Sequence, residues 1–267
     1  MTSKINTVVL GHPIEHSLSP YIHNLAFKEH GIDGEMTAVN VKPEELTECI
    51  KRLKSQGISG ASVTLPHKVE IKKYCDNFSE DALAIGAVNC LEFRSEKIIG
   101  HNTDAEGFVM GLTNHNVAPR GHTIALFGGG GAAKALHCKL KPHNVVDVFV
   151  RNPDKIKWCD ARLWSESLVQ KNAHAFSMLI DCTSIGLDEQ REKETQSKFP
   201  IQLLNQDAVV SSLIYHRKTK MHKEALDRNL KVIDGLDMLV GQARLAFQIW
   251  TGVSFDHHAI IQKLRRI

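Results

Sequence analysis

A strand that runs straight into four glycines and then into a helix constrains the fold more than any other stretch of this chain. The apolar residues 123–127 indicate a buried strand, residues 128–131 are all glycine, and apolar residues at helical spacing follow over 131–140. This sequence is typical of a βαβ unit, in which a helix connects two parallel strands. It therefore predicts an α/β protein that contains a doubly wound parallel sheet.

The alternation of strands and helices extends over the whole chain. Beyond residue 103 the sequence predicts helices at 104–114, 131–140 and 218–229 and strands at 123–127, 145–150, 177–182, 208–214 and 231–233. The first hundred residues predict strands at 5–10, 35–41, 58–65, 87–93 and 97–100 and helices at 20–30 and 43–56. We expect helix over 236–267 and a solvated loop for the polar run 187–198.

Composition and charge exclude several classes of protein. The 267 residues carry 33 Lys and Arg against 30 Asp and Glu, a balance unlike that of nucleic-acid-binding proteins. No apolar run reaches membrane-spanning length, and the first residues lack the apolar core of a signal peptide. Six cysteines occur without a C-x-x-C pair, and there is no H-E-x-x-H. We therefore expect reduced thiols in a cytoplasmic protein that has no metal site.

The glycine loop fits a nucleotide-binding pattern. Gly128-x-Gly130-x-x-Ala133 matches the dinucleotide fingerprint and lies between a predicted strand and a predicted helix, as that function requires. Glycine lets the backbone approach a pyrophosphate, and the N–H groups at the start of the helix can bind the anion. The alternative is an ordinary tight turn of an α/β domain.

The end of the next strand bears on which dinucleotide would bind. An NAD site usually has an acidic residue there, whereas this chain has Arg151 and Asn152, followed by Lys155, with no acid before Asp154. A guanidinium suits a 2′-phosphate, so the sequence favours NADP over NAD. The alternative is that Arg151 is an ordinary solvated arginine.

Two charged residues at predicted helix starts form the candidate catalytic pair. Pro66 ends a β-rich run, and a helical pattern over 67–73 places Lys68 in a first turn, where a cation is mildly disfavoured. Thr103 and Glu106 have capping-box spacing, which places Asp104 in another first turn, where a carboxylate is favoured. Each could be a solvated charge near a helix cap. Together they suggest a facing lysine–aspartate pair suited to proton transfer.

Other polar residues suggest ligand contacts. Ser19 precedes Pro20 as a predicted N-cap, and Ser17 can offer a second hydroxyl to a carboxylate. Asn89 in an apolar strand and Gln242 in a C-terminal helix are predicted to be buried amides, which need hydrogen-bond partners. Structural hydrogen bonding and contact with a polyhydroxylated ligand both remain open for these two amides.

At this point a family resemblance is visible. The segments HSLSP, SVTLPHK, GAVNCL, NTDAEGF, GGGGAAKAL, TSIG and DGLDMLVGQA occur in the order seen in shikimate dehydrogenases, over nearly the full chain. The resemblance implies a substrate-binding domain at 1–102, to which C-terminal helices at 238–267 return, and a Rossmann-type NADP-binding domain at 103–237. It also implies reversible NADPH-dependent reduction of 3-dehydroshikimate to shikimate, in the chorismate pathway of aromatic amino-acid biosynthesis.

The resemblance assigns roles to individual positions. Lys68 and Asp104 match the catalytic lysine and aspartate. The expected substrate contacts are Ser17, Ser19, Thr64, Lys68, Asn89, Asp104, Tyr215 and Gln242. The expected cofactor contacts are Gly128, Gly129, Gly130, Gly131, Ala132, Arg151, Asn152, Lys155, Thr183, Leu213 and Gly235. No metal, nucleic acid or membrane is expected as a partner, and the chain is expected to be a monomer or a homodimer.

Four positions depart from the family pattern. Ser62 replaces an asparagine, Asp181 replaces the asparagine of N-A-T-S, Ser212 replaces an aspartate, and Lys220 replaces a proline. The departures at Asp181 and Ser212 keep open a catalytically weak paralogue that binds ligand or nucleotide as a sensor. A second alternative is a quinate/shikimate dehydrogenase of relaxed specificity, although Arg151 disfavours it because an acid at that position would suit NAD.

Overall fold

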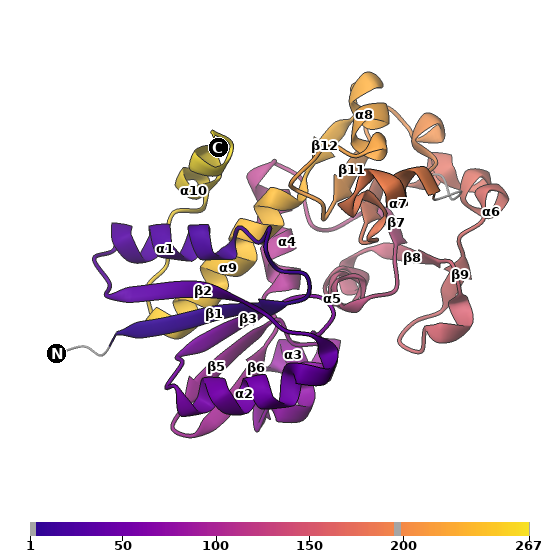
Figure 1. The fold of residues 1–267 in the computed structure, drawn as a ribbon. Helices are drawn as coiled ribbons and strands as arrows, with labels where there is room; N and C mark the ends of the chain where they lie inside the picture. Colours follow the sequence, from indigo (N-terminus) through magenta and orange to yellow (C-terminus); the bar gives the residue numbers. More distant parts are fainter. Residues whose placement is uncertain (1–3, 195–198, 267) are drawn as a thin grey trace. The chain divides into compact units, whose positions relative to one another are not determined.

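The computed structural model describes residues 4–194 and 199–266, which form two compact units. Unit 1 comprises residues 1–107 and 239–267, and unit 2 comprises residues 108–238. Two helices, α4 (Asp104–Asn114) and α9 (Gly235–Thr251), contain the two crossings between the units (Figure 1).

Unit 1 is built on a six-stranded mixed sheet in the order β2-β1-β3-β5-β6-β4. The strands are β1 (Ile5–Gly11), β2 (Gly34–Asn40), β3 (Gly60–Val63), β4 (Asn77–Phe78), β5 (Cys90–Arg94) and β6 (Lys97–His101). Strands β1, β2 and β3 are parallel, β5 runs antiparallel to β3 and β6, and β4 is parallel to β6. Its other helices are α1 (Ser19–Glu29), α2 (Leu46–Ser55), α3 (Glu80–Ile85) and α10 (His257–Leu264).

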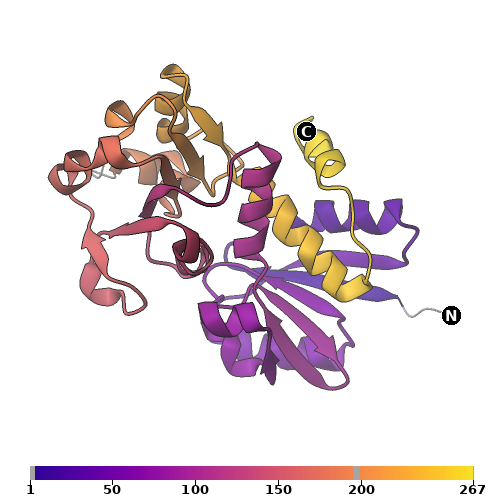
Figure 2. The same cartoon turned by 180° about the vertical axis from the view of Figure 1, so that it is seen from behind.

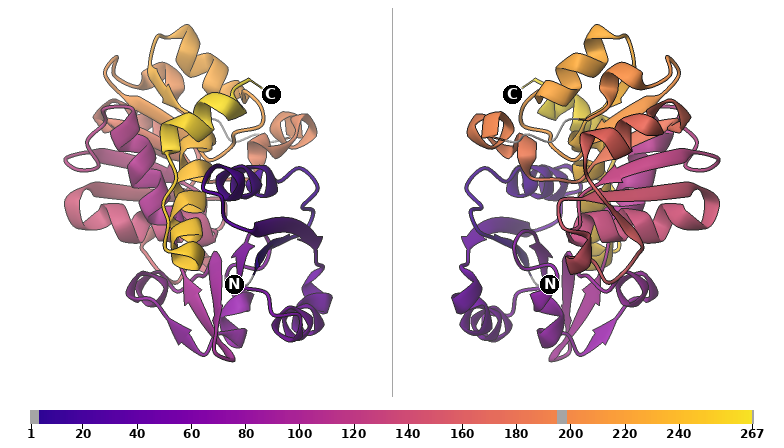
Figure 3. Two further views of the ribbon diagram at one scale, coloured as in Figure 1. Left: turned by 90° about the vertical axis from the view of Figure 1, so that its left-hand side faces the viewer. Right: turned by 90° about the vertical axis from the view of Figure 1, so that its right-hand side faces the viewer.

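Helices cover both faces of this sheet. Leu46, Ile50 and Leu53 of α2 are buried against alternate residues of the strands. The opposite face carries α1 and α9, as Figures 2 and 3 show, and there Phe27 and Phe247 lie 5.0 Å apart between ring centroids. The helical spacing of the apolar residues in α2 thus predicts the buried face that the structure has.

Unit 2 is a six-stranded, fully parallel sheet in the order β12-β11-β10-β7-β8-β9. The strands are β7 (Thr123–Phe127), β8 (Val145–Val150), β9 (Ala161–Leu163), β10 (Met178–Asp181), β11 (Val209–Ser212) and β12 (Lys231–Ile233). Its helices are α5 (Gly131–Leu140), α6 (Glu166–Lys171), α7 (Glu189–Glu194) and α8 (Lys220–Asp227). With β7 counted as strand 1 and the sheet followed from β9 to β12, the order is 3-2-1-4-5-6, which is that of the Rossmann fold. The predicted fold class is therefore confirmed.

Alternate residues of β7 enter two separate cores. Ile124 and Leu126 face the core that contains Leu136 of α5, and Ala125 and Phe127 face the core that contains Met221 of α8. A strand buried on both faces explains why residues 123–127 are almost continuously apolar.

Several sequence predictions about local structure were wrong. Lys68 does not lie in an α-helix: it sits in a turn that precedes a 3-10 helix at Glu70–Tyr74. Ser19 is the first residue of α1 rather than its N-cap, which is Leu18. Asn89 precedes β5 rather than lying within a strand. Each of the three residues lies within two positions of the start of an element, and local patterns define such ends poorly.

The polar run 187–198 is not simply a loop. Residues Glu189–Glu194 form α7, which begins where the Asp188 carboxylate accepts the Arg191 N–H at 2.7 Å, and residues 195–198 lie outside the described residues. Glu192 is half-buried and binds Arg217 at 2.9 Å, so this helix is stabilised by contacts distant in sequence. The sequence prediction also missed β4, β9, α3 and α6, all short elements.

Within residues 4–194 and 199–266, no helix combines the length and apolar character that a membrane crossing requires.

Candidate functional site

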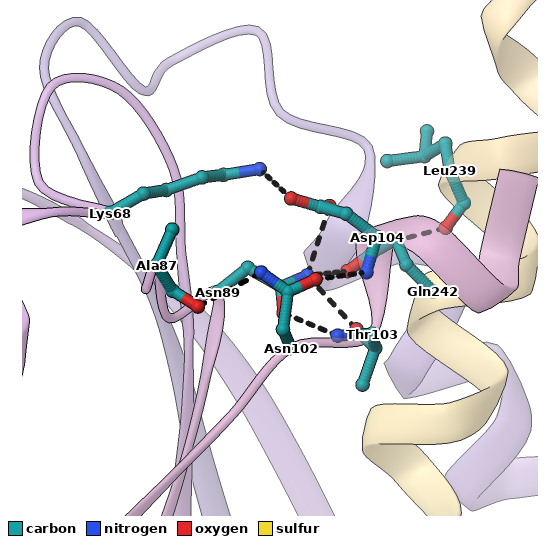
Figure 4. Close-up of polar contacts among 8 residues, drawn as sticks. All are labelled: Lys68, Ala87, Asn89, Asn102, Thr103, Asp104, Leu239 and Gln242. Carbon is teal, nitrogen blue, oxygen red and sulfur yellow. Dashed lines mark hydrogen bonds and ion pairs between the residues drawn. The ribbon is translucent and has the colours of Figure 1, made fainter. Parts of the chain in front are cut away.

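Lys68 and Asp104 lie in direct contact in unit 1. The Lys68 Nζ donates to Asp104 Oδ2 at 2.5 Å, although 36 residues separate the two in sequence (Figure 4). The lysine side chain is 16% exposed and the aspartate side chain 4%. One partner therefore reaches solvent while the other is enclosed, a suitable arrangement for a group that exchanges a proton with a ligand.

The Lys68 backbone is fixed by two anchors. The neighbouring His67 is buried, and its Nε2–H donates to the Val41 carbonyl at 2.7 Å, since a carbonyl can only accept. The Val88 N–H donates to the Lys68 carbonyl at 2.8 Å. The turn after Pro66 thus holds the lysine without the helix that the sequence predicted.

Asp104 is held at the start of α4 by two asparagines. Asn89 Nδ2 donates to Asp104 Oδ1 at 3.0 Å and to Thr103 Oγ1 at 2.9 Å, and its Oδ1 accepts the Thr103 N–H at 2.7 Å. Asn102 Oδ1 accepts the Asp104 N–H at 3.2 Å. Since the first N–H groups of a helix lack intrahelical partners, these acceptors stabilise the helix start where the carboxylate sits.

Gln242 of α9 joins the same cluster. Its Oε1 lies 3.5 Å from Asn89 Nδ2, and its Nε2 donates to the Leu239 carbonyl at 2.8 Å (Figure 4). The structure thus brings together Lys68, Asn89, Asp104 and Gln242 within unit 1.

A hydrogen bond that the sequence did not predict joins Ser17 and Ser19. The Ser17 hydroxyl accepts the Ser19 N–H at 3.3 Å, next to the N-cap residue Leu18, whose own side chain makes no cap hydrogen bond. Thr64 follows β3, where its N–H donates to the Leu10 carbonyl at 2.9 Å. All three residues lie in unit 1, and their expected contacts with a substrate stay predictions.

The glycine loop of unit 2 has the geometry of an anion site. Gly128 has φ +119°, and a Cβ there would lie 3.0 Å from the Cys182 carbonyl oxygen. A Cβ on Gly129 would lie 2.5 Å from Ile156, whereas one on Gly130 would meet nothing within 4 Å. Gly130 is the N-cap of α5 and no side chain caps this helix. The N–H groups near Gly131 and Ala132 are therefore available to a pyrophosphate.

The other predicted cofactor residues also lie in unit 2. Arg151, Asn152 and Lys155 are exposed just beyond β8. A Cβ on Gly235 would lie 2.2 Å from the Leu213 carbonyl oxygen, so these two predicted nicotinamide neighbours touch along the backbone. Thr183 follows β10. Tyr215, which is predicted to contact the substrate and not the cofactor, also lies in unit 2, where its ring meets the His216 ring edge-to-face at 5.9 Å between centroids.

Two of the departures from the family pattern contact each other. Asp181 and Ser212 are register partners in β10 and β11, and Ser212 Oγ donates to Asp181 Oδ2 at 3.3 Å. Asp181 Oδ1 accepts the Thr183 N–H at 2.8 Å. Burial raises the pKa of Asp181 to about 6, although these hydrogen bonds act in the opposite direction. The remaining departures are Ser62, whose buried hydroxyl has no partner among the described residues, and Lys220, the first residue of α8.

Sequence reasoning missed two residues that shape the site, His67 and Asn102, and gave Thr103 only a capping role. His67, Asn102 and Thr103 are all buried and all hydrogen-bonded around Lys68 or Asp104. The signal for Asn102 and Thr103 was their place beside Asp104 at a predicted helix start. Among the described residues, no group of His, Cys, Asp or Glu side chains could hold a metal ion.

The fold and these residues define a class: a two-unit α/β protein with a Rossmann-type unit and a separate unit that carries a buried lysine–aspartate pair. Residues 9–91 match the family model of the shikimate dehydrogenase substrate binding domain, and residues 235–265 match that of the shikimate 5′-dehydrogenase C-terminal domain. The chain belongs to the shikimate dehydrogenase family.

Individual relatives cover nearly the whole chain. It is 37% identical to the NADP(+) shikimate dehydrogenase of Methanocaldococcus jannaschii, over 97% of this chain and 96% of that protein. The corresponding enzyme of Bacillus licheniformis is 35% identical over 97% and 94%. The crystal structure of shikimate 5-dehydrogenase from Thermus thermophilus with NADP(H) and shikimate matches with a TM-score of 0.87 and 29% identity, covering 98% of this chain and 99% of that one.

Proposed function

We propose that this protein is an NADP-dependent shikimate dehydrogenase that interconverts 3-dehydroshikimate and shikimate. In the reduction, the substrate ketone takes up a hydride and a proton, which gives shikimate and NADP+. The observation that carries this proposal is the 2.5 Å contact between Lys68 and Asp104, within the unit that matches a substrate-binding domain.

Lys68 serves as the proton donor in the reduction. As hydride reaches the carbonyl carbon, negative charge develops on the carbonyl oxygen, and an ammonium group can both stabilise and protonate it. The 16% exposure of the lysine side chain supports access to a ligand. In the reverse direction the neutral amine accepts the hydroxyl proton.

Asp104 orients the lysine and the substrate. Its Oδ2 binds Lys68 and its Oδ1 accepts from Asn89, so the carboxylate is fixed on both sides. We assign Ser17 and Ser19 to the substrate carboxylate and Thr64, Asn89, Tyr215 and Gln242 to the ring hydroxyl groups. A polyhydroxylated ring needs many donors and acceptors, and the buried amides supply both kinds.

Unit 2 is proposed to hold NADP, which supplies the hydride when bound. The uncapped start of α5 and the open space above Gly130 fit a pyrophosphate. Arg151, Asn152 and Lys155 would bind the 2′-phosphate, since they are exposed and include two cationic side chains. Thr183, Leu213 and Gly235 would adjoin the nicotinamide. On this assignment, residues 1–102 with 238–267 form the substrate-binding domain and residues 103–237 form the cofactor-binding domain, while Asp104 and Tyr215 of the second range also contact the substrate.

We further infer that the protein acts in the cytoplasm as a monomer or a homodimer. The six cysteines are all free, which fits a reducing compartment. No nucleic acid or membrane is needed for the proposed reaction.

Absorbance at the nicotinamide band tests the function directly. Purified protein is assayed with shikimate or quinate, each with NADP or NAD, and we expect the highest kcat/KM for shikimate with NADP. A comparable value for quinate would support the relaxed-specificity alternative. Binding of NADPH and shikimate without turnover would contradict the proposal and favour a ligand-binding paralogue.

A further inference from the structure

We propose that Asn102 is a positioning residue for the reaction, because its amide sets the spacing between the backbone segments that carry Lys68 and Asp104. The side chain is buried at 5% exposure, between the end of β6 and the start of α4. This inference rests on the proposed function, which assigns the proton transfer to Lys68.

Both the nitrogen and the oxygen of the Asn102 side-chain amide make hydrogen bonds to the backbone. Its Nδ2 donates to the Ala87 carbonyl at 2.9 Å, and its Oδ1 accepts the Asp104 N–H at 3.2 Å (Figure 4). A hydroxyl at this position could accept the Asp104 N–H as a helix cap does, but serine is too short to reach Ala87 as well. The amide therefore does more than cap a helix.

The residue after Ala87 hydrogen-bonds the Lys68 backbone. Val88, the next residue, donates its N–H to the Lys68 carbonyl at 2.8 Å. Lys68, the 87–88 backbone, Asn102 and Asp104 thus form a closed ring of contacts, completed by the 2.5 Å bond between Lys68 Nζ and Asp104 Oδ2. Asn89 also joins these two backbones through the Thr103 N–H and the His101 carbonyl, but only Asn102 bonds the Asp104 N–H itself, so its length bears on where the Asp104 backbone lies.

Loss of the Asn102 hydrogen bonds should lower kcat more than it changes KM. Displacement of a catalytic group by about 1 Å can cost on the order of 10²-fold in rate. Asn89 would still hold the Asp104 carboxylate and the Thr103 N–H, so the aspartate stays in the site, but the Asp104 N–H loses its connection through Asn102 to the Ala87 carbonyl.

Asn24 offers a matched control in the same unit. Its Nδ2 donates to the Met36 carbonyl at 3.0 Å, and its Oδ1 accepts the Met36 N–H at 2.7 Å. It thus makes the same two kinds of backbone bond as Asn102, but none of its contacts involves Lys68 or Asp104. Asn24 is exposed whereas Asn102 is buried, so Asn24→Ala reports the loss of two such backbone bonds at a more solvated site that contacts neither Lys68 nor Asp104.

The test compares steady-state kinetics and thermal stability of Asn102→Ala, Asn102→Ser and Asn24→Ala. We expect Asn102→Ala to lower kcat by about 10²-fold with the KM for NADP within twofold of wild type. Asn102→Ser keeps an oxygen for the Asp104 N–H, so it should keep more stability while its kcat stays low. Asn24→Ala should lose stability and keep its kcat.

The outcomes separate this inference from the proposed function. A kcat for both Asn102 variants that is within twofold of the value for Asn24→Ala, at equal folded concentration, would overturn the positioning role. A wild-type protein that shows no shikimate-dependent reduction of NADP would instead refute the function itself. Should Asn102→Ala not fold, the kcat of Asn102→Ser decides the question in the same way.

Discussion

Acidification should destabilise unit 1 through His23, a residue outside the proposed chemistry. The His23 ring is fully buried in α1, 5.1 Å from the Trp250 ring and 6.0 Å from the Phe247 ring, both on α9. Neither ring nitrogen has a hydrogen-bond partner among the described residues. Burial therefore lowers the pKa of His23 from 6.5 to about 3, because the apolar surroundings disfavour the imidazolium.

The sign and size of the effect follow from proton linkage. The unfolded chain binds the proton below pH 6.5 and the folded chain only near pH 3, so stability is complete above pH 6.5 and falls as the pH decreases through this window. One pH unit corresponds to about 1.4 kcal/mol, so the loss at pH 5 amounts to about 2 kcal/mol.

A variant without the imidazole tests this reasoning. His23→Leu keeps a similar volume and cannot be protonated, so its free energy of unfolding should change between pH 7.5 and pH 5 by about 2 kcal/mol less than that of wild type. Hydrogen exchange of the α1 and α9 amides in a urea series measures unit 1 alone. His258→Gln, which alters an exposed histidine of α10, serves as the control and should match wild type. Equal pH dependence in wild type and His23→Leu would refute the argument.

Three further predictions concern the proposed site and its departures from the family pattern. Lys68→Ala should lower kcat by about 10²–10⁴-fold with NADPH affinity unchanged, as measured by the absorbance assay and by titration, and substantial residual turnover would reject Lys68 as the acid. Arg151→Ala should narrow the preference for NADPH over NADH in kcat/KM, and an unchanged ratio would mean that another residue reads the 2′-phosphate. Asp181→Asn should weaken the pH dependence of the free energy of unfolding of unit 2. Folding raises the pKa of Asp181 from 3.8 to about 6, so the free energy of unfolding of the wild type falls by up to about 3 kcal/mol as the pH rises through that window. Hydrogen exchange of the β10 and β11 amides measures this loss, and a wild-type stability that stays constant from pH 4 to pH 7 would contradict it.

Local patterns in the sequence were sufficient for the longer strands and helices of the Rossmann-type unit, though not for β9, α6 and α7. Strands such as 123–127 are apolar on both faces, apolar residues in helices such as 131–140 recur about every 3.6 residues, and glycine marks the turn between strand and helix. Each of these signals lies within a few neighbouring residues. The place of Asp104 at the start of α4 was predictable for the same reason, whereas the predicted helix starts at Lys68 and Ser19 were wrong.

The contacts between distant segments were decided only by the tertiary structure. The neighbour relation of Asp181 and Ser212 depends on the register of two strands, and Asn89 meets Gln242 across 153 residues of sequence. The turn that holds Lys68 also depends on a distant residue, Val41, through His67. Short elements such as α3 and β9 have too few residues for a clear period, so packing determines whether they form.

The sequence by itself therefore determined the α/β class, the glycine loop and which residues are candidates for the chemistry, because those depend on backbone preference and side-chain periodicity over short stretches. The tertiary structure decided which of those residues touch and how the amide of Asn102 connects the Ala87 backbone to Asp104. It also decided how far burial shifts the pKa values of His23 and Asp181. These properties depend on sheet order and on desolvation, and both arise only when segments far apart in the chain pack together.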